Sequence, residues 1–175
     1  MQRCGGAMTR VVQVVIVSIL VCLLNSSALC QDKTGIQEFS LERTECFGPC
    51  PVYRATIRSD GTVTYVGIKN VPRLGIYTGN ANPYVIKHLS ELVGQINFFS
   101  LENEYSSEMT DQPTAVTSVL RGGERKTVRN YGLSGPSLLW AFESSMDAAI
   151  ASVTDWVKKQ PKKNSGRSAK GRRPS

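Results

Sequence analysis

The sequence has few of the residues from which catalytic sites are built. It contains a single histidine, His88, so a serine or cysteine nucleophile would have only this imidazole as its base. It contains no Gly-x-Gly-x-x-Gly or phosphate-loop motif, which excludes the common nucleotide-binding signatures. Residues 132–135 are one residue short of a nucleophile elbow. These absences favour a protein that is not an enzyme, and the sequence predicts no cofactor.

Acidic side chains are absent from the last part of the chain. From Lys158 onward there are eight basic residues and no acidic one, whereas residues 31–157 contain eleven basic and fourteen acidic residues. The net charge of +7 therefore describes the tail and not the domain. The tail has no apolar run, so we predict that residues 158–175 are disordered. Its basic residues are Lys158, Lys159, Lys162, Lys163, Arg167, Lys170, Arg172 and Arg173.

Residues 1–30 have the pattern of a signal peptide or an N-terminal membrane anchor. Arg3 and Arg10 give a positively charged start, residues 11–24 are almost wholly apolar, and small polar residues follow. No charge occurs between Arg10 and Asp32, so the segment is also just long enough for an uncleaved anchor. We therefore expect an exported protein of the periplasm or cell envelope, with secretion or an inner-membrane anchor as alternatives.

The basic tail has two interpretations. It is either a solubilising end or a tether to a polyanion such as anionic lipid or lipopolysaccharide. Each basic residue near an anionic surface contributes about 1 kcal/mol, so the tail could hold the chain there at low salt. No aromatic residues interleave the basic ones, and an exported chain meets little nucleic acid. We therefore expect no nucleic-acid partner.

Residues 31–157 are long enough for one domain with its own core. Asp60-Gly61 predicts a hairpin through a tight primed turn, and Asn82-Pro83 predicts a helix start. An apolar stripe over residues 137–157 predicts the last helix. We predict an α+β fold with a small antiparallel sheet, the element order ββ(β)αββα, and helices packed on one face. The expected strands are residues 36–43, 52–58, 62–68, 71–77, 114–121 and 126–131.

Two of the five cysteines, Cys46 and Cys50, lie in the predicted domain. Gly48 and Pro49 between them allow a tight turn that brings both β carbons within bridging distance, and disulfides persist in exported proteins. The leading interpretation is a structural disulfide. Two alternatives stay open: a redox pair, or a metal site in which both thiolates and His88 bind copper(I). The Cys-x-x-x-Cys-Pro spacing resembles that of the Sco-type copper chaperones.

A longer resemblance covers most of the domain, from about residue 36 to residue 156. Residues 41–53 read Leu-Glu-Arg-Thr-x-Cys-Phe-Gly-x-Cys-Pro-x-Tyr, and residues 60–63 read Asp-Gly-Thr-Val. These motifs resemble an uncharacterised family of exported bacterial domains of unknown function, which residues 110–114 and 130–132 also match. The resemblance implies a bacterial envelope protein. It implies no activity, and the basic tail lies outside it.

The sequence therefore favours an exported, non-catalytic binding or interaction module with a structural disulfide. We expect its partner to be a protein or polymer of the envelope. Candidate contact residues are Arg54 and Arg58, which share one face of a strand, and Trp140, which lies on the polar side of the last helix. The alternative function is a thiol-redox or copper(I)-binding envelope protein that uses Cys46 and Cys50.

Overall fold

The first half of the chain forms four adjacent antiparallel strands followed by a helix. The computed structural model describes residues 35–160. Each of the first four strands pairs with the next one along the chain. The elements are β1 (Ile36–Arg43), β2 (Val52–Arg58), β3 (Thr62–Lys69), β4 (Gly75–Asn80) and α2 (Pro83–Gln95).

The second half repeats strands before a helix but adds two very short strands. A 3-10 turn follows α2, and the chain then forms a second hairpin and a long helix. The elements are η1 (Phe98–Ser100), β5 (Glu104–Tyr105), β6 (Thr114–Arg121), β7 (Glu124–Tyr131), α3 (Ser137–Ala151) and β8 (Val157–Lys158).

The turn between β2 and β3 confirms the predicted hairpin but not its turn type. Gly61 has a φ of 91°, and Asp60 is not among the residues of positive φ in the described chain. Asp60 Oδ1 accepts a hydrogen bond from Thr62 N at 2.8 Å. This is a three-residue connection in which the aspartate caps the turn and only the glycine is left-handed.

Helix α2 begins where its sequence predicts. Asn82 is the N-cap residue, and its Oδ1 accepts a hydrogen bond from Tyr84 N at 2.9 Å. Pro83 follows in the first turn, where its missing N–H leaves no hydrogen bond unmade. Leu89 and Val93 are buried against the sheet, so the apolar stripe of this helix joins the core.

The predicted α+β fold with a small antiparallel sheet is wrong. The described chain is mostly sheet: one mixed sheet of eight strands, in the order β5-β7-β6-β1-β2-β3-β4-β8, and two α-helices. β5 pairs with β7 in parallel, whereas the other neighbouring pairs are antiparallel. β5 and β8 have two residues each, and a segment of two residues is too short for an alternating pattern to predict a strand.

The last helix ends six residues earlier than predicted. Helix α3 stops at Ala151, and the carboxylate of Asp155 then accepts hydrogen bonds from the backbone N and side-chain Nδ2 of Asn80, at 2.9 and 2.7 Å. This contact brings the chain back to the edge of β4. There Val157 and Lys158 pair as β8, and Lys159 N donates to Ile76 O at 2.8 Å. The first two residues of the predicted tail therefore belong to the sheet edge.

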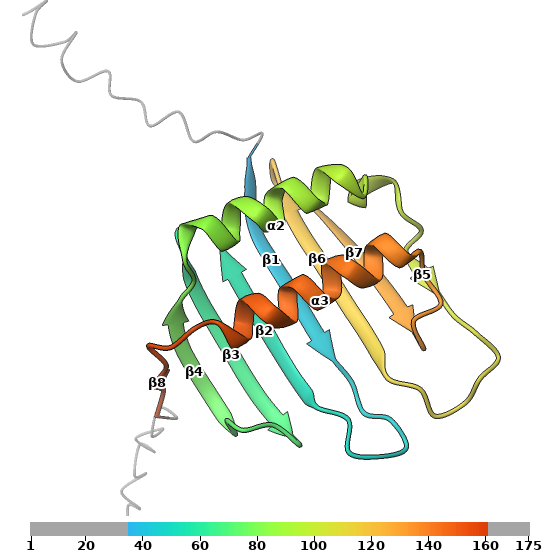
Figure 1. Ribbon diagram of the computed structural model, residues 1–175, viewed down its shortest axis with the longest axis horizontal. Helices are drawn as coiled ribbons and strands as arrows, with labels where there is room; N and C mark the ends of the chain where they lie inside the picture. Colours follow the sequence, from blue (N-terminus) through green and yellow to red (C-terminus); the bar gives the residue numbers. More distant parts are fainter. Residues whose placement is uncertain (1–34, 161–175) are drawn as a thin grey trace, which may run out of the picture. The chain divides into compact units, whose positions relative to one another are not determined.

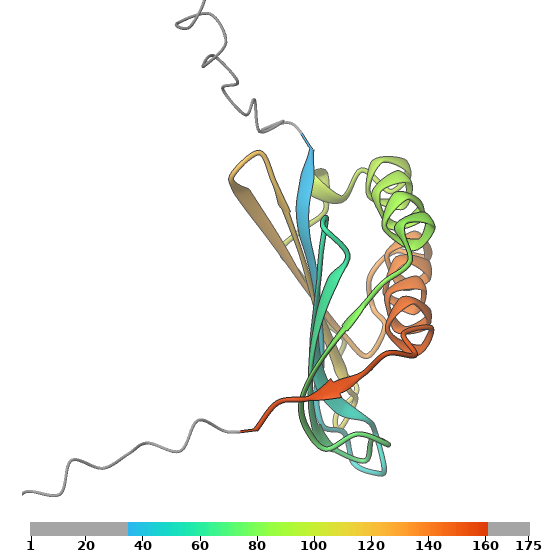
Figure 2. The same ribbon diagram turned by 90° about the vertical axis from the view of Figure 1, so that its left-hand side faces the viewer.

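Both helices cover the same face of the sheet, and the core lies between the two layers (Figures 1 and 2). Alternate strand residues point toward the helices. The largest fully buried side chains are Phe39, Phe98, Phe142, Leu41, Ile57, Leu89, Leu139 and Met146. In Figure 2 the opposite face of the sheet has no helix against it.

Residues 1–34 and 161–175 lie outside the described residues, and these include the predicted signal peptide or anchor at residues 1–30 and the basic tail residues from Lys162 to Arg173. Within residues 35–160, neither helix has the length and apolar character needed to cross a membrane.

Candidate functional site

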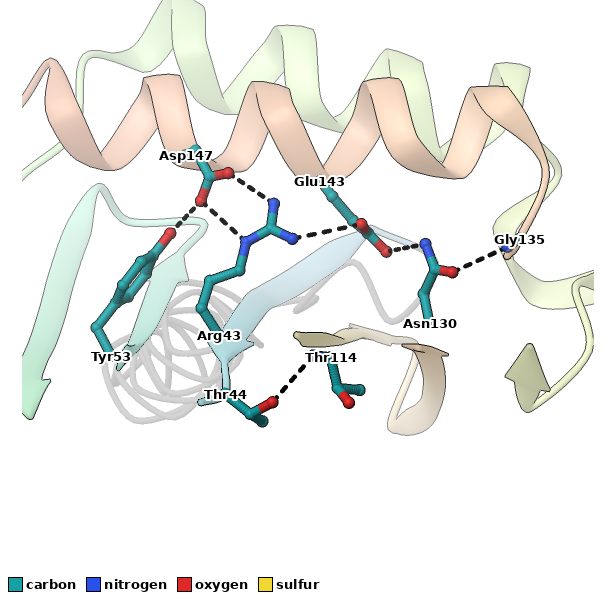
Figure 3. Close-up of polar contacts among 8 residues, drawn as sticks. All are labelled: Arg43, Thr44, Tyr53, Thr114, Asn130, Gly135, Glu143 and Asp147. Atoms are coloured by element: carbon teal, nitrogen blue, oxygen red, sulfur yellow. Dashed lines mark hydrogen bonds and ion pairs between the residues drawn. The ribbon is translucent and has the colours of Figure 1, made fainter. Parts of the chain in front are cut away.

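The site is built around Arg43, the last residue of β1. Arg43 is in phase with Phe39 and Leu41, so its side chain points into the layer between sheet and helices. Its Nη2 donates to Asp147 Oδ2 at 2.6 Å, and its Nη1 lies 3.6 Å from Glu143 Oε2 (Figure 3). Glu143 and Asp147 are four residues apart on α3 and therefore share one face of the helix.

Two neighbouring strands complete this polar network. The hydroxyl of Tyr53, on β2, donates to Asp147 Oδ1 (Figure 3). Asn130, on β7, donates from Nδ2 to Glu143 Oε1 at 3.0 Å and accepts from Gly135 N at 2.9 Å. The network therefore runs across the sheet from β7 through β1 to β2, under α3.

Exposure differs sharply along the network. The side chain of Glu143 is fully buried, that of Arg43 is 17 % exposed, and that of Asp147 is 40 % exposed. Burial of a carboxylate without a partner is costly, and the Arg43 guanidinium compensates the buried Glu143 as well as the partly exposed Asp147. Asp147 is the acidic member that solvent or a ligand can reach.

Burial and charge set the protonation of these groups. Burial raises the pKa of Glu143, although the Asn130 hydrogen bond and the Arg43 charge oppose the shift. Burial and the bond to Asp147 raise the pKa of Tyr53, so its hydroxyl remains a donor. For Arg43, burial alone lowers the pKa, but Asp147 and Glu143 outweigh it and the net shift is upward. At the exposed end of the network, Arg43 and Tyr53 therefore stay donors and Asp147 stays the acceptor.

Glu143→Gln is expected to change the pH dependence of stability. The folded-state pKa of Glu143 lies above its ordinary value of 4.5. Protonated Glu143 therefore contributes fully to the free energy of unfolding below pH 4.5, and this contribution is lost as the pH rises through the folded-state pKa. Glutamine keeps the acceptor for Asn130 and does not titrate. The stability of the variant relative to the native chain should therefore rise with pH, by about 1.4 kcal/mol per unit of pKa shift. Urea unfolding from acid to neutral pH measures this, and a constant difference would contradict it.

A pocket of about 220 Å³ opens beside Asp147, at the end of α3. Its walls combine aromatic rings with a few polar groups. Its lining residues include Tyr53, Tyr65, Asn70, Arg73, Asp147 and Trp156. The rings of Tyr65 and Trp156 have centroids 5.6 Å apart, and the Arg73 guanidinium lies 5.7 Å from the Trp156 ring. A mostly apolar pocket with a few convergent polar groups is the usual form of a small-molecule site.

Two charges of the pocket differ in how they are compensated. Asp147 is paired with Arg43. Among the ion pairs within residues 35–160, none includes Arg73. The Nε1 of Trp156 is buried and has no hydrogen-bond partner in the same part of the chain. The pocket therefore offers a cation that no acidic side chain of the described residues compensates.

The sequence reasoning missed this network, although a signal was present. Glu143 falls within the apolar stripe of the last helix, and Arg43 falls on the apolar face of β1. Charged residues are seldom buried without a partner. Two opposite charges on apolar faces therefore indicate a buried pair, but the pattern does not say which residues meet.

The predicted pairing of the two cysteines is confirmed: Cys46 and Cys50 form a disulfide, with their Cα atoms 5.8 Å apart. The bond closes the loop between β1 and β2. His88, which one alternative adds as a copper ligand, lies on α2, and Figures 1 and 2 place α2 and this loop at opposite ends of the sheet. Within residues 35–160, no group of three or more His, Cys, Asp or Glu residues is placed to hold a metal ion.

Removing the disulfide is expected to lower the free energy of unfolding by about 2 kcal/mol, because the closed loop is short. The double variant Cys46→Ser/Cys50→Ser and the reduced native chain should show the same loss of unfolding free energy. Urea unfolding with and without reductant measures the loss. An unchanged midpoint on reduction would show that the bond does not stabilise the fold.

The three candidate contact residues do not form one surface. Arg54 and Arg58 lie on the sheet face away from the helices, where each is ion-paired, with Glu42 at 3.1 Å and with Glu38 at 3.6 Å. Trp140 lies on α3, on the other side of the sheet, and is 49 % exposed.

Comparison with known families supports the resemblance to a domain family of unknown function. Residues 37–150 match the model of a domain of unknown function, DUF6438. The chain belongs to the DUF6438 family. The matched part of this DUF6438 protein includes every member of the polar network and the disulfide. A search of curated proteins found no match.

Proposed function

We propose that this DUF6438 protein is an exported, non-catalytic binding module, and that its ligand site is the pocket beside Asp147. The observation that carries the proposal is an aromatic-lined pocket joined to a rigid polar network at its one exposed acid. Asp147 is held by Arg43 and Tyr53, so the pocket wall is pre-organised. The members of the network that could act as a base are either fully buried or already paired.

Export is supported by the sequence pattern of residues 1–30 and by the disulfide, since disulfides persist in oxidising compartments. The motif at residues 41–53 supports a bacterial envelope protein by resemblance. Fractionation of the producing cell, with mass spectrometry of the mature N-terminus, tests both. An intact N-terminus in the cytosolic fraction would reject export.

The chemistry of the pocket favours a ligand with an apolar ring and an anionic group. The rings of Tyr65 and Trp156 offer stacking surface. Arg73 carries the charge that no acidic side chain of the described residues neutralises, and Asn70 lies in the same wall. An anionic group at Arg73 would gain a charge-assisted hydrogen bond.

The binding proposal predicts that benzoate binds more tightly than benzylamine, which has a similar ring and the opposite charge. The chain has two tryptophans, so a Trp140→Phe background leaves Trp156 as the fluorescent reporter of the pocket. Arg73→Gln should weaken benzoate binding about tenfold, or ~1.4 kcal/mol, and leave benzylamine unchanged. Arg54→Gln on the other sheet face is the matched control. Equal binding of both probes would reject this pocket as the ligand site.

The alternative is a thiol-redox or copper(I) function of Cys46 and Cys50. Its support is the spacing of the two cysteines and their closeness in space. Titration of thiols on the purified oxidised chain separates the two functions. A pair that exchanges with glutathione, or that binds copper(I) one-to-one and loses it in Cys46→Ser, would replace the structural role.

A second contact is proposed for the basic tail, with an anionic envelope polymer or lipid as its partner. Its support is the charge from Lys158 onward. Salt-dependent binding to phosphatidylglycerol vesicles, lost on deletion of residues 162–175, is the expected result. Equal binding by the shortened chain would assign the tail no such role.

A further inference from the structure

One end of the sheet carries an exposed apolar side chain on each of four loops. The loops are residues 44–51, 70–74, 106–113 and 132–136, and together they are termed the loop end (lower edge of Figure 1). Their exposed large apolar side chains are Phe47 (90 % exposed), Met109 (57 %), Leu74 (56 %) and Leu133 (45 %). These four side chains share one end of the sheet, which points to an interaction surface there, whereas single exposed apolar side chains are normal on any protein.

Hydrogen bonds between the loops hold this surface together. The disulfide closes a short ring beneath Phe47, so the most exposed aromatic side chain sits on a constrained backbone. Binding through a pre-ordered surface loses less conformational entropy. The bonds are Phe47 N to Asp111 O (3.1 Å), Asn70 Nδ2 to Cys50 O (3.1 Å) and Gly132 N to Pro113 O (3.0 Å).

The backbone of the loop end is strained at three residues that are not glycine. Asn70, Asp111 and Leu133 have φ values of 53°, 64° and 59°. Leucine rarely adopts this conformation, because its Cβ crowds the following carbonyl. Strained residues cluster at binding sites, where the geometry is held for a function. The strain and the apolar exposure therefore point to the same surface.

Charge is distributed unevenly across the loop end. The strand order places the loop after β3 and the short β8 on one side of Phe47, and residues 106–113 on the other. The first side carries exposed Arg73 and Lys159, beside Lys69, which is paired with Glu45 at 3.4 Å, and the second carries exposed Glu108 and Asp111. The surface thus has a basic flank, an apolar centre and an acidic flank.

We propose that the loop end binds a second copy of this chain. A twofold axis roughly perpendicular to the sheet, close to Phe47, places the basic flank of one copy against the acidic flank of the other and brings the two Phe47 side chains together. A twofold axis in the plane of the sheet would oppose like charges. The charge pattern therefore selects both the occupant and its orientation.

An anionic lipid surface fits the loop end less well. With its flanks, the loop end carries three acidic residues, Glu45, Glu108 and Asp111, and three basic residues, Lys69, Arg73 and Lys159. A surface with no net charge gains no net attraction from a negatively charged membrane. The apolar centre can pack against the apolar centre of a second copy, and the basic and acidic flanks of the two copies then attract each other.

The first test is sedimentation velocity of the full chain, without reductant, over a wide range of concentration. A reversible dimer is expected. Phe47→Ser should raise its dissociation constant about 30-fold, the effect of removing a hot-spot aromatic. Tyr84→Ser removes an aromatic side chain that is 81 % exposed on α2 and should leave the dissociation constant unchanged. Phe47 is 90 % exposed, so its substitution leaves the core intact.

The second test exchanges the charges of the flanks. One chain carries Arg73→Glu and Lys159→Glu, and the other carries Glu108→Lys and Asp111→Asn, in which asparagine retains the left-handed backbone. Each chain alone should dimerise more weakly than the native chain. Their mixture should recover a heterodimer at least tenfold more stable than either homodimer.

Three results would overturn the proposal: a native chain that stays monomeric, a dimer unaffected by Phe47→Ser, or a mixture that does not recover. Phosphatidylcholine vesicles provide the remaining comparison. Vesicle binding that requires Phe47 in a monomeric chain would assign the loop end to a membrane instead.

Discussion

Arg43→Ala is expected to lower the free energy of unfolding by at least about 3 kcal/mol. The substitution leaves Glu143, which is fully buried, without the cation that compensates it, and removes one of the two partners of Asp147. Breaking a buried ion pair by removing one member typically costs about 3–5 kcal/mol, because the remaining charge is stranded. Urea unfolding at neutral pH measures the loss.

The pH dependence of this variant distinguishes a stranded charge from lost packing. Protonation removes the charge of Glu143, so the loss caused by Arg43→Ala should shrink as the pH is lowered. Glu143→Gln in the same chain should recover part of the stability at neutral pH. A loss that is independent of pH, and that Glu143→Gln does not reduce, would contradict this account of the network.

Lys87→Ala provides the control for Arg43→Ala. Lys87 also pairs with an acid, Glu91, four residues along its helix at 3.9 Å, but both side chains are exposed. Such pairs contribute about 0.3–0.5 kcal/mol. The difference between the losses of unfolding free energy in Arg43→Ala and in Lys87→Ala therefore measures the effect of burial.

Gly67→Ala is expected to cost about 3 kcal/mol and to change the pocket. A β carbon at Gly67 would overlap the Arg73 carbonyl oxygen and lie 2.9 Å from the Arg73 carbonyl carbon and from Val71 Cγ2. The obstacle is mostly backbone, so the loop after β3 must move. Overpacking usually costs about 1–3 kcal/mol, and backbone clashes lie at the upper end.

The pocket should respond as well, since the displaced loop carries Arg73 and Val71 in its wall. Gly67→Ala should therefore weaken benzoate binding along with stability. Gly94→Ala is the matched control. Apart from its chain neighbours and the backbone of its own helix, no atom lies within 4 Å of the added β carbon. Alanine also favours a helix over glycine by about 1 kcal/mol. Equal stability of the two variants would contradict the predicted clash.

The features of the fold that could be predicted depend on residues close together in sequence. Asp60-Gly61 turns the first hairpin, and Asn82-Pro83 starts α2, because capping and positive φ are local properties. The disulfide spans four residues, so its geometry is also local.

The fold class could not be predicted, because the strands that change it carry no local pattern. β5 and β8 form only where another strand edge is present to receive them. β8 in addition needs Asp155 to bind Asn80, a contact 75 residues apart in sequence. The apolar stripe continues past Ala151 in the sequence, but the helix ends there and the chain turns to the tertiary contact of Asp155 with Asn80.

The candidate site divides in the same way. The sequence by itself favoured a disulfide between the two cysteines, located the first hairpin and the start of α2, and placed Glu143 within an apolar stripe. Only the tertiary structure decided that Arg43 meets Asp147, 104 residues away, and that four separate loops present their apolar side chains at one end of the sheet. The reason is physical: turns and caps are stabilised by neighbours along the chain, whereas buried ion pairs and surfaces exist only where packing brings distant residues together.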